Sequence, residues 1–523
     1  MKKLLLFGNE AIALGAYHAG ATVGTGYPGT PSTEILENFK KFKDVYSEWS
    51  INEKVALEVA IGSSLTGART LVTMKHVGLN VAADPLFTAS YTGVKGGLVI
   101  VCADDPYMHS SQNEQDNRYY AKSAKLPMLD PSDSQEAYDF TKYAFELSEK
   151  YDTPVILRTT TRISHSKSVV IDSNERSEKK DFIFEKNPKK YVMIPAYARA
   201  RHFDVEKRLQ DIETDSNNFD INKMEIKSNE IGFITSGICY AYLKEVMPEA
   251  SVLKLGVINP LPKKLIKDFC SKVKKVYVIE ELDPFFEDQI KAMGIKVIGK
   301  EVFPITGELN PDIIKNFFNN IKKEENTNIS VKIPPRPPQL CPGCPHRTVF
   351  SILSKSGLVV SGDIGCYTLG VMPPFTAIDT CIDMGASIGV AQGMEIVLKD
   401  KNKTVAVIGD STFAHSGITS LFNAAYNKRN ILTIVLDNGT TAMTGMQPNP
   451  FSGETINNEP TMQIDYEKLA GSIGIVSPNF RVVDAYKSED VEKAIKELID
   501  SKKLSLLVVK GPCVILKRKK KES

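Results

Sequence analysis

Two stretches of the chain decide its fold, TVAVIGDS at Thr404–Ser411 and ILTIVLDNG at Ile431–Gly439. Each is an apolar run of strand length that ends in residues typical of turns. The segment between them has the composition of a helix. A strand, a helix and a second strand in this order are typical of neighbouring parallel strands. The sequence therefore predicts a parallel α/β sheet around these two stretches.

A polar side chain follows each of the two predicted strands. Asp410 comes directly after the first strand, and Asn438 after the second. Open α/β sheets bind ligands at the carboxyl ends of their strands. A carboxylate, an amide oxygen and a main-chain oxygen from the following loop suit Mg²⁺ bound to a diphosphate. The alternative is two ordinary turns, because GD and DN are common turn dipeptides.

The alternation of strand-like and helix-like stretches extends over most of the chain and predicts an α/β fold class throughout. The expected segments are an α/β domain at 1–163, a polar connecting arm at 164–228, a second α/β domain at 229–325, a Pro-rich linker at 326–339, a third α/β domain at 340–516 and a basic tail at 517–523. Charged tails of this kind are usually solvated and disordered.

The overall charge argues against a nucleic-acid or membrane partner. The 523 residues include 65 Lys and Arg against 63 Asp and Glu, which gives a net charge of +2. So small a charge provides no general field for polyanions. Asn9 and Glu10 interrupt the N-terminal apolar run before it reaches the length of a signal sequence. No apolar run is long enough for a membrane span. We expect a cytoplasmic protein.

Four of the eight cysteines occur in motifs rather than in apolar contexts. Cys341 and Cys344 form a CxxC pair, Cys366 ends the phrase GDIGC, and Cys513 lies in KGPCVI. A CxxC pair alone is compatible with a zinc knuckle, a redox pair or chance. The other four, Cys102, Cys239, Cys270 and Cys381, are expected to be core thiols.

Several long phrases resemble the 2-oxoacid:ferredoxin oxidoreductase family, and within it the indolepyruvate-type alpha subunits. They are YPGTPS from Tyr27, NEKVALEVAIG from Asn52, MKHVGLNVAADP from Met74, CPGCPHR from Cys341, GDIGCYTLG from Gly362, GDSTFAHSGI from Gly409 and LDNGTTAMTGMQP from Leu436. The resemblance runs in one order over nearly the whole chain. It implies three doubly wound α/β domains of the thiamine-diphosphate-enzyme type, namely pyrimidine-binding, transketolase C-terminal-like and diphosphate-binding.

The resemblance assigns a cofactor site to the third domain. The phrase GDS, 26 residues at 412–437 and then Asn438 match the family's diphosphate-Mg²⁺ motif, although Ser411 and Asp437 replace the usual Gly and Asn. The implied Mg²⁺ ligands are Asp410, Asn438 and the main-chain oxygen of Thr440. The other implied cofactor contacts are Gly409, Ser411, Met384, Gly385 and His346, with Met384 as an apolar support beneath the thiamine. Met384 could instead be plain core.

A glutamate of the first domain is implied to activate the cofactor. In the family, a Glu hydrogen-bonded to the aminopyrimidine ring lies nine residues before a Gly-rich turn that ends its helix. Glu53 and Gly62 match this offset, whereas Glu58 does not. The alternative for Glu53 is a surface helix residue. If Glu53 is catalytic, the site forms between domains, very often across a dimer.

The resemblance also implies substrate contacts and an iron-sulfur cluster. Thr30 would contact the 2-oxoacid and Arg118 would pair with its carboxylate, unless Arg118 is a surface residue of a polar loop. Lys75 and His76 would shape a pocket for an aryl group. Cys341, Cys344, Cys366 and Cys513 would hold a [4Fe-4S] cluster, although the motif could also be kept for shape alone.

The implied function is that of the catalytic subunit for ferredoxin-dependent oxidative decarboxylation of aryl 2-oxoacids to acyl-CoA and CO₂. The expected partners are a smaller beta subunit, ferredoxin and coenzyme A, in a heterodimer or heterotetramer. His346 or His415 is a candidate for proton transfer. We find no run typical of the family's C-terminal ferredoxin-like domain, so electrons would leave through another subunit or directly to ferredoxin. The alternatives are a non-oxidative thiamine-diphosphate decarboxylase or carboligase, and a zinc-binding assembly scaffold.

Overall fold

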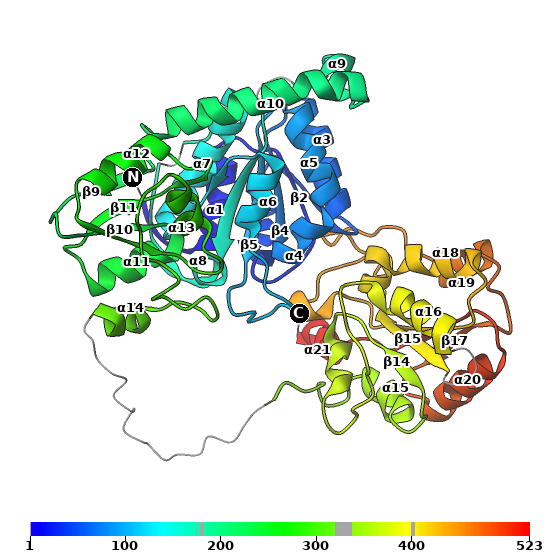
Figure 1. Cartoon of the computed structure of the whole chain (residues 1–523). Helices are drawn as coiled ribbons and strands as arrows, with labels where there is room; N and C mark the ends of the chain where they lie inside the picture. The colour runs from blue at the N-terminus through cyan, green and yellow to red at the C-terminus, as the bar shows by residue number, and fades with distance from the viewer. Residues whose placement is uncertain (1, 174, 178–181, 319–336, 399–402, 523) are drawn as a thin grey trace. The chain divides into compact units, whose positions relative to one another are not determined.

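The computed structural model describes residues 2–173, 175–177, 182–318, 337–398 and 403–522 (Figure 1). The chain divides into two compact units, residues 1–330 and 331–523. Both units contain parallel strands with helices between them, which confirms the predicted α/β fold class. Most of the predicted linker at 326–339 lies outside the described residues.

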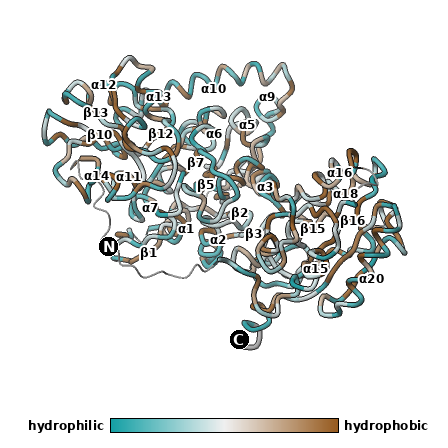
Figure 2. The backbone as a smooth tube through the Cα atoms, turned by 60° about the horizontal axis from the view of Figure 1, so that its bottom comes forward, coloured by the Kyte–Doolittle hydropathy of each residue, from teal (hydrophilic) through white to brown (hydrophobic). Residues whose placement is uncertain are grey.

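The second unit is built on a five-stranded parallel sheet with the order β14-β15-β16-β18-β17. Its central strands β15 (Thr404–Gly409) and β16 (Leu432–Asp437) are the two stretches on which the fold prediction rests, and they pair in parallel. The other strands are β14 (Val359–Ser361), β17 (Phe480–Asp484) and β18 (Ser505–Lys510). Figure 2 shows the hydrophobic colouring of the tube along β15 and β16.

Helices cover both faces of this sheet, which explains why its central strands are largely apolar on both faces. Successive side chains of β15 enter different cores, because neighbouring residues of a strand point to opposite faces. Val405 and Val407 pack with residues of α15 and α20, whereas Ala406 and Ile408 pack with residues of α16 and α18. These helices are α15 (His346–Leu353), α16 (Ala386–Leu398), α18 (Ile418–Tyr426) and α20 (Ser488–Asp500), with α19 (Tyr466–Ser472) on the second face.

The C-terminal segment differs from the expected disordered tail. Residues Val514–Glu522 form helix α21, so most of the basic stretch is helical. The helix begins with three apolar residues, Val514, Ile515 and Leu516. Only three residues separate it from the end of β18 at Lys510. The tail therefore continues the folded part of the second unit.

The first unit contains a seven-stranded sheet with the order β12-β6-β7-β5-β4-β2-β3. All of its pairs are parallel except β12 with β6. The strands are β2 (Val23–Gly26), β3 (Tyr46–Trp49), β4 (Thr70–Lys75), β5 (Leu98–Asp104), β6 (Met128–Leu129), β7 (Val155–Thr160) and β12 (Val257–Asn259). The helices around it are α1 (Gly8–His18), α2 (Thr33–Phe39), α3 (Glu53–Leu65), α4 (His76–Val81), α5 (Ala83–Thr92), α6 (Asn117–Ala124), α7 (Ser134–Tyr151) and α8 (Thr161–His165).

A four-stranded sheet with the order β13-β10-β11-β9 forms the rest of the first unit. Its strands are β9 (Lys223–Glu225), β10 (Ile231–Thr235), β11 (Ser251–Lys254) and β13 (Lys275–Ile279), and its helices are α11 (Gly237–Val246), α12 (Lys263–Ser271), α13 (Phe285–Ala292) and α14 (Pro311–Phe318). β12, within the predicted domain at 229–325, completes the edge of the first sheet. The two predicted domains are therefore interlocked in one compact unit.

The predicted arm at 164–228 has regular structure of its own. It contains β8 (Lys167–Asp172), which pairs antiparallel with β1 (Lys2–Phe7), and the short helix α9 (Pro188–Tyr191). Its longest element is helix α10 (Pro195–Ser216), which Figure 1 shows along one side of the first unit. α10 buries Val205 and Ile212, while half of its residues are exposed.

A buried ion pair joins the two sheets of the first unit. Lys254 of β11 is fully buried and its ammonium donates to Glu136 of α7. Glu136 also accepts hydrogen bonds from the Ser132 hydroxyl at 2.6 Å and from Lys223 at 3.0 Å. Burial alone would raise the pKa of Glu136, but these partners lower that pKa to about 2. Glu136 is thus ionised at neutral pH and holds α7 against β11.

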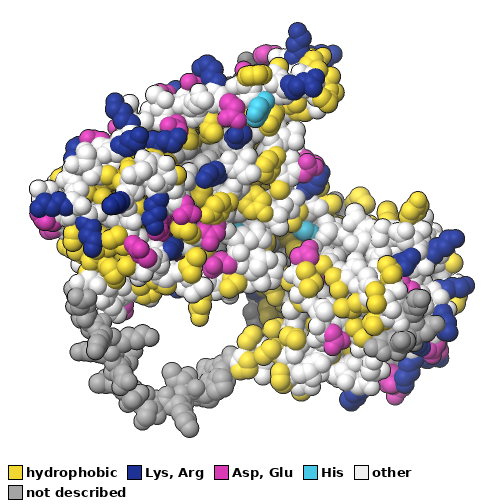
Figure 3. All heavy atoms as spheres, viewed as in Figure 1, with side chains coloured by type: hydrophobic (Ala, Val, Ile, Leu, Met, Phe, Trp, Pro, Cys, Tyr) yellow, Lys and Arg dark blue, Asp and Glu magenta, His cyan; other side chains and the backbone are white. Residues whose placement is uncertain are grey.

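The view of the surface in Figure 3 shows no face dominated by one sign of charge. There, Lys and Arg side chains are interspersed with Asp and Glu over the first unit. None of the described helices combines the length and the apolar composition needed to cross a bilayer.

Candidate active site

The predicted metal ligands Asp410 and Asn438 lie at the carboxyl ends of two adjacent strands. Gly409 pairs with Leu436 in the register of β15 and β16, so the residues that follow leave the sheet at the same edge. Asp410 is 2% exposed, and one of its carboxylate oxygens accepts a hydrogen bond from Asn449 at 3.1 Å. Burial and the nearby Asp437 raise the pKa of Asp410 to about 7. A cation at this edge would offset both charges.

The loop after β16 is held over the end of β15. The side-chain oxygen of Asn438 accepts a hydrogen bond from the Thr440 amide at 3.0 Å. The Thr441 hydroxyl donates to the Ser411 hydroxyl at 2.8 Å, which ties the two strand ends together. Gly439 has a φ of 74°, a conformation that L side chains rarely adopt. Residues 410–411 and 438–440 therefore lie at the same edge of the sheet.

Asp363 organises the segment of Met384 and Gly385, a role that sequence reasoning missed. Its two carboxylate oxygens accept from the Gly385 amide at 2.7 Å and the Ser387 amide at 2.9 Å. A Cβ at Gly385 would lie 1.9 Å from the Ser416 hydroxyl oxygen, so only glycine fits there. Met384 itself is half-buried. Asp363 follows strand β14. Its position at the end of a parallel strand is the sequence feature that could have predicted this role.

The four motif cysteines line one cavity of about 100 Å³ in the second unit, together with His346 and Asn438. Burial raises the pKa of Cys344 and of Cys366 to about 11. All eight cysteines are free. Among the described residues, no group of three or more His, Cys, Asp or Glu side chains has the arrangement of a metal site. The thiols are thus gathered at one cavity without a closed ligand set.

The two candidate histidines differ in environment. His346 is 4% exposed, and burial lowers its pKa to about 4, so the imidazole is neutral at pH 7. Its Nε2 lies 3.4 Å from the side-chain nitrogen of Asn438. A pKa this low does not suit the predicted proton transfer near neutrality. His415 is buried in the π-helical turn Phe413–Gly417, with Nδ1 at 2.9 Å from the Ser416 hydroxyl.

Glu53 begins helix α3 in the first unit and is buried, so it is not the surface residue of the alternative interpretation. Asn52 caps the helix by accepting a hydrogen bond from the Val55 amide at 2.9 Å. Glu53 is 5% exposed and packs closely on Gly78, where an added Cβ would lie 2.7 Å from Glu53. Glu58 instead lies at the surface and pairs with Lys54.

Gly62 does not end the helix as the family pattern predicts. α3 continues through Leu65 and ends at the turn of Thr66 and Gly67. A Cβ at Gly62 would meet no atom within 4 Å. The proposed role of Glu53 therefore rests on its position at the first turn of α3. It does not rest on the spacing between Glu53 and Gly62.

Arg118 has a different role in this structure from the predicted one. Its side chain is 2% exposed and lies in a buried cluster, with Nε donating to Asp116 at 2.8 Å and Nη1 donating to Glu280 at 2.5 Å. Nη2 donates to Asp116 and to the carbonyl oxygens of Glu281 and Asp283. These bonds tie α6 to the loop after β13. The guanidinium is committed to protein carboxylates and is not presented to a substrate.

Thr30 lies in the loop that follows β2, near the turn at 110–111. The Ser110 hydroxyl donates to the Thr30 carbonyl oxygen at 3.2 Å, and the Ser32 hydroxyl donates to the Gly29 carbonyl oxygen at 2.8 Å. The first bond joins the loop to the segment after β5, and the second closes a turn within the loop.

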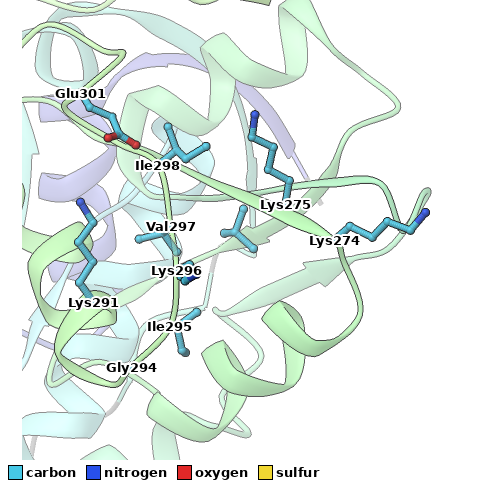
Figure 4. A pocket seen from close by; sticks show the side chains of 10 residues that line it. Lys274, Lys275, Lys291, Gly294, Ile295, Lys296, Val297, Ile298 and Glu301 are labelled. Carbon is cyan, nitrogen blue, oxygen red and sulfur yellow. The ribbon is translucent and has the colours of Figure 1, made fainter.

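A second hollow in the first unit is lined by lysines. It has a volume of about 640 Å³ and lies beside β13, with Lys274, Lys275, Lys291, Lys296 and Glu301 among its lining residues. Figure 4 shows that the lysine side chains extend in different directions rather than toward one point. Lys274 pairs with Glu230 and Lys291 with Glu287. None of the predicted site residues lines this hollow.

Comparisons with known proteins show which families the chain is similar to. Residues 363–509 match the family model of the thiamine pyrophosphate enzyme C-terminal TPP-binding domain, and residues 14–226 match that of the pyruvate flavodoxin/ferredoxin oxidoreductase thiamine-diphosphate-binding domain. The chain is 42% identical to the indolepyruvate oxidoreductase subunit IorA of Archaeoglobus fulgidus, over 98% of this chain and 87% of that protein. The corresponding protein of Pyrococcus horikoshii is 41% identical, over 98% and 86%.

A solved structure shares the fold. A 2-oxoglutarate:ferredoxin oxidoreductase from Magnetococcus marinus, solved with 2-oxoglutarate, coenzyme A and succinyl-CoA bound, matches with a TM-score of 0.52 and 18% identity. The match covers 61% of this chain and 65% of that one.

Proposed function

Because this chain belongs to the indolepyruvate oxidoreductase subunit IorA family of thiamine-diphosphate-dependent 2-oxoacid:ferredoxin oxidoreductases, we propose that its substrates are aryl 2-oxoacids of the indolepyruvate kind. The chain is the catalytic subunit for ferredoxin-dependent oxidative decarboxylation of 2-oxoacids. The observation that carries the aryl proposal is the identity of 42% to an indolepyruvate oxidoreductase subunit over 98% of the chain.

The second unit would hold the diphosphate end of the cofactor through Mg²⁺. The proposed ligands are Asp410, Asn438 and the main-chain oxygen of Thr440, which gather at one edge of the sheet. Their oxygen chemistry suits Mg²⁺, and a cation bound there would offset the burial and the Asp437 charge that raise the pKa of Asp410. Gly409, Ser411 and Gly385 would let the main chain approach the cofactor, and Met384 would support it. His346 would contact it from the cysteine cavity.

Glu53 would act on the other end of the cofactor. When bound, thiamine diphosphate supplies the carbon nucleophile and stabilises the charge that remains after CO₂ leaves. Glu53 would hold a proton between its carboxylate and the aminopyrimidine ring. The packing of Gly78 against the Glu53 side chain fixes the carboxylate and excludes water from one side of it. Thr30 would contact the 2-oxoacid.

We also propose that Cys341, Cys344, Cys366 and Cys513 hold a [4Fe-4S] cluster, because all four line one cavity and thiolates are the ligands of such clusters. Anaerobically purified protein is then expected to be brown and to contain the iron of one cluster per chain. Cys366→Ser should lose most of that iron, whereas Cys270→Ser, which changes a thiol outside the cavity, should keep it. Colourless protein without iron, or zinc in place of iron, would rule the cluster out.

The family is multi-subunit and uses ferredoxin and coenzyme A. For this chain we propose a smaller beta subunit in a heterodimer or heterotetramer. Oxidation of a 2-oxoacid and coenzyme A to acyl-CoA and CO₂ releases two electrons, which ferredoxin accepts one at a time. A cluster at the cysteine cavity would give these electrons a first acceptor.

The substrate proposal is tested by assaying reduction of methyl viologen by the enzyme with its partner subunit under anaerobic conditions. Indolepyruvate, phenylpyruvate and pyruvate are compared side by side with coenzyme A present. We expect kcat/KM for both aryl substrates to exceed that for pyruvate by at least about tenfold, because an apolar pocket discriminates by the apolar surface it buries. Activity confined to pyruvate would overturn the aryl assignment.

A further inference from the structure

Lys75 lies among the residues proposed to handle the substrate. It is the last residue of β4, and its ammonium donates to the Ser110 carbonyl oxygen at 2.9 Å. A Cβ at Gly29 would lie 3.0 Å from Lys75 Cδ, so the side chain passes directly over the Gly29 backbone. The Ser110 hydroxyl in turn contacts the Thr30 carbonyl oxygen. Lys75 and Thr30 thus both contact Ser110.

The same lysine is close to Glu53. Lys75 is followed by His76, which begins helix α4, and Gly78 of that helix packs directly on Glu53. The negative charge of Glu53 acts on the Lys75 ammonium. Strand β4, helix α4 and helix α3 therefore bring Lys75, Thr30 and Glu53 to one edge of the first sheet. This edge is the carboxyl end of its parallel strands, where α/β sheets bind ligands.

The Lys75 ammonium forms no ion pair with any residue in the described part of the chain. Of the acidic groups, Asp105 has the largest effect on the pKa of Lys75. Its oxygens already accept hydrogen bonds from the Ser110 amide at 2.8 Å, the Ser111 hydroxyl at 2.7 Å and the Thr161 hydroxyl at 2.8 Å. Burial lowers the pKa of Lys75 to about 8, and the charges of Asp105 and Glu53 oppose this shift only in part.

The neighbouring His76 adds no charge. It is fully buried, its Nε2 lies 3.0 Å from the Asn113 carbonyl oxygen, and burial lowers its pKa to about 4. Lys75 is therefore a partly desolvated cation beside a neutral imidazole. A cation in this position is stabilised by an anion that enters with a ligand, because the ligand replaces the water that burial removes.

We infer that Lys75 binds the carboxylate of the 2-oxoacid substrate, the role that the family resemblance gives to Arg118. This inference rests on the proposed function of the same site. Arg118 cannot take the role here, because its donors are bound to Asp116, Glu280 and two main-chain oxygens. A phosphate of coenzyme A shares the anionic chemistry, but the contacts with Gly29 and Ser110 beside Thr30 and the proximity to Glu53 favour the 2-oxoacid.

The test measures binding of two inert ligands of similar shape, 3-indolepropionate and 3-indolepropanol, by calorimetry on the assembled enzyme. Lys75→Met should weaken binding of the acid about 30-fold, the usual effect of losing a charge-assisted hydrogen bond, and leave the alcohol within about twofold. Lys75→Arg should restore most of the acid affinity. Lys207→Met removes the same charge from the exposed face of α10 and should change neither. Equal losses for both ligands, or unchanged acid binding, would overturn the inference.

Steady-state kinetics separate this inference from the proposed function. In Lys75→Met, KM for indolepyruvate should rise about 30-fold, while KM for coenzyme A stays constant. A rise in KM for coenzyme A instead would identify its phosphate as the ligand and refute the carboxylate assignment. In wild type, KM for indolepyruvate should rise above pH 8 as Lys75 loses its proton, and this rise should vanish in Lys75→Arg. Wild-type enzyme without activity on any 2-oxoacid would refute the proposed function itself.

Discussion

Glu53→Gln is expected to lower kcat roughly 10²- to 10⁴-fold, the range typical of losing a group that transfers a proton in catalysis. The amide keeps the shape of the side chain, so the tight contact with Gly78 is preserved. What it loses is the carboxylate that would share a proton with the aminopyrimidine ring. The measurement is the rate of methyl viologen reduction with indolepyruvate, together with the Kd for thiamine diphosphate, which should change by less than about tenfold.

Glu58→Gln is the matched control for this experiment. Glu58 lies on the same helix α3, but it is exposed and pairs with Lys54. We expect its kcat to stay within about twofold of wild type, because exposed ion pairs contribute little. If Glu53→Gln were as active as Glu58→Gln, the assignment of Glu53 as the activating residue would be wrong.

Asp410→Ala is expected to weaken Mg²⁺-dependent binding of thiamine diphosphate by at least about 100-fold, since it removes the only charged ligand from the proposed set. Asp410 is buried at the end of β15, and no other described carboxylate replaces it at that position except Asp437, which follows the neighbouring strand. The measurement is a titration of the apo protein with thiamine diphosphate at fixed Mg²⁺, followed by quenching of intrinsic fluorescence.

Two further variants make this titration interpretable. Asp410→Asn keeps the side-chain volume and the contact with Asn449 while removing the charge, so it should fold like wild type and still lose most of the Mg²⁺ dependence. Asp500→Ala removes an exposed carboxylate of α20 and should bind as wild type does. Unchanged cofactor affinity in folded Asp410→Asn and Asp410→Ala would contradict the proposed metal site.

The parts of the fold that the sequence predicted correctly depend on local pattern. β15 and β16 are buried on both faces, so they appear in the sequence as largely apolar runs, and the turn residues after them mark their ends. The sequence also distinguishes Glu53 from Glu58. In the structure Glu53 is buried, whereas Glu58 is exposed.

The parts that the sequence could not predict depend on contacts between distant residues. Arg118 lies in a polar stretch of the sequence, yet its side chain is buried and paired with Glu280, which is 162 residues away in the chain. β12 leaves its own predicted domain and joins the edge of the first sheet through a pairing that no local pattern records. Asn449 reaches Asp410 from a loop 39 residues further along the chain. Each of these features is tertiary and has no periodicity to reveal it.

Oxidative decarboxylation by this enzyme is tested by the product balance of one reaction. The anaerobic enzyme, with its partner subunit, coenzyme A and oxidised ferredoxin, is given indolepyruvate, and CO₂, acyl-CoA and reduced ferredoxin are counted together. We predict one acyl-CoA and two reduced ferredoxins for each CO₂. Release of CO₂ with an aldehyde as the organic product and no reduced ferredoxin would contradict it and identify a non-oxidative thiamine-diphosphate decarboxylase.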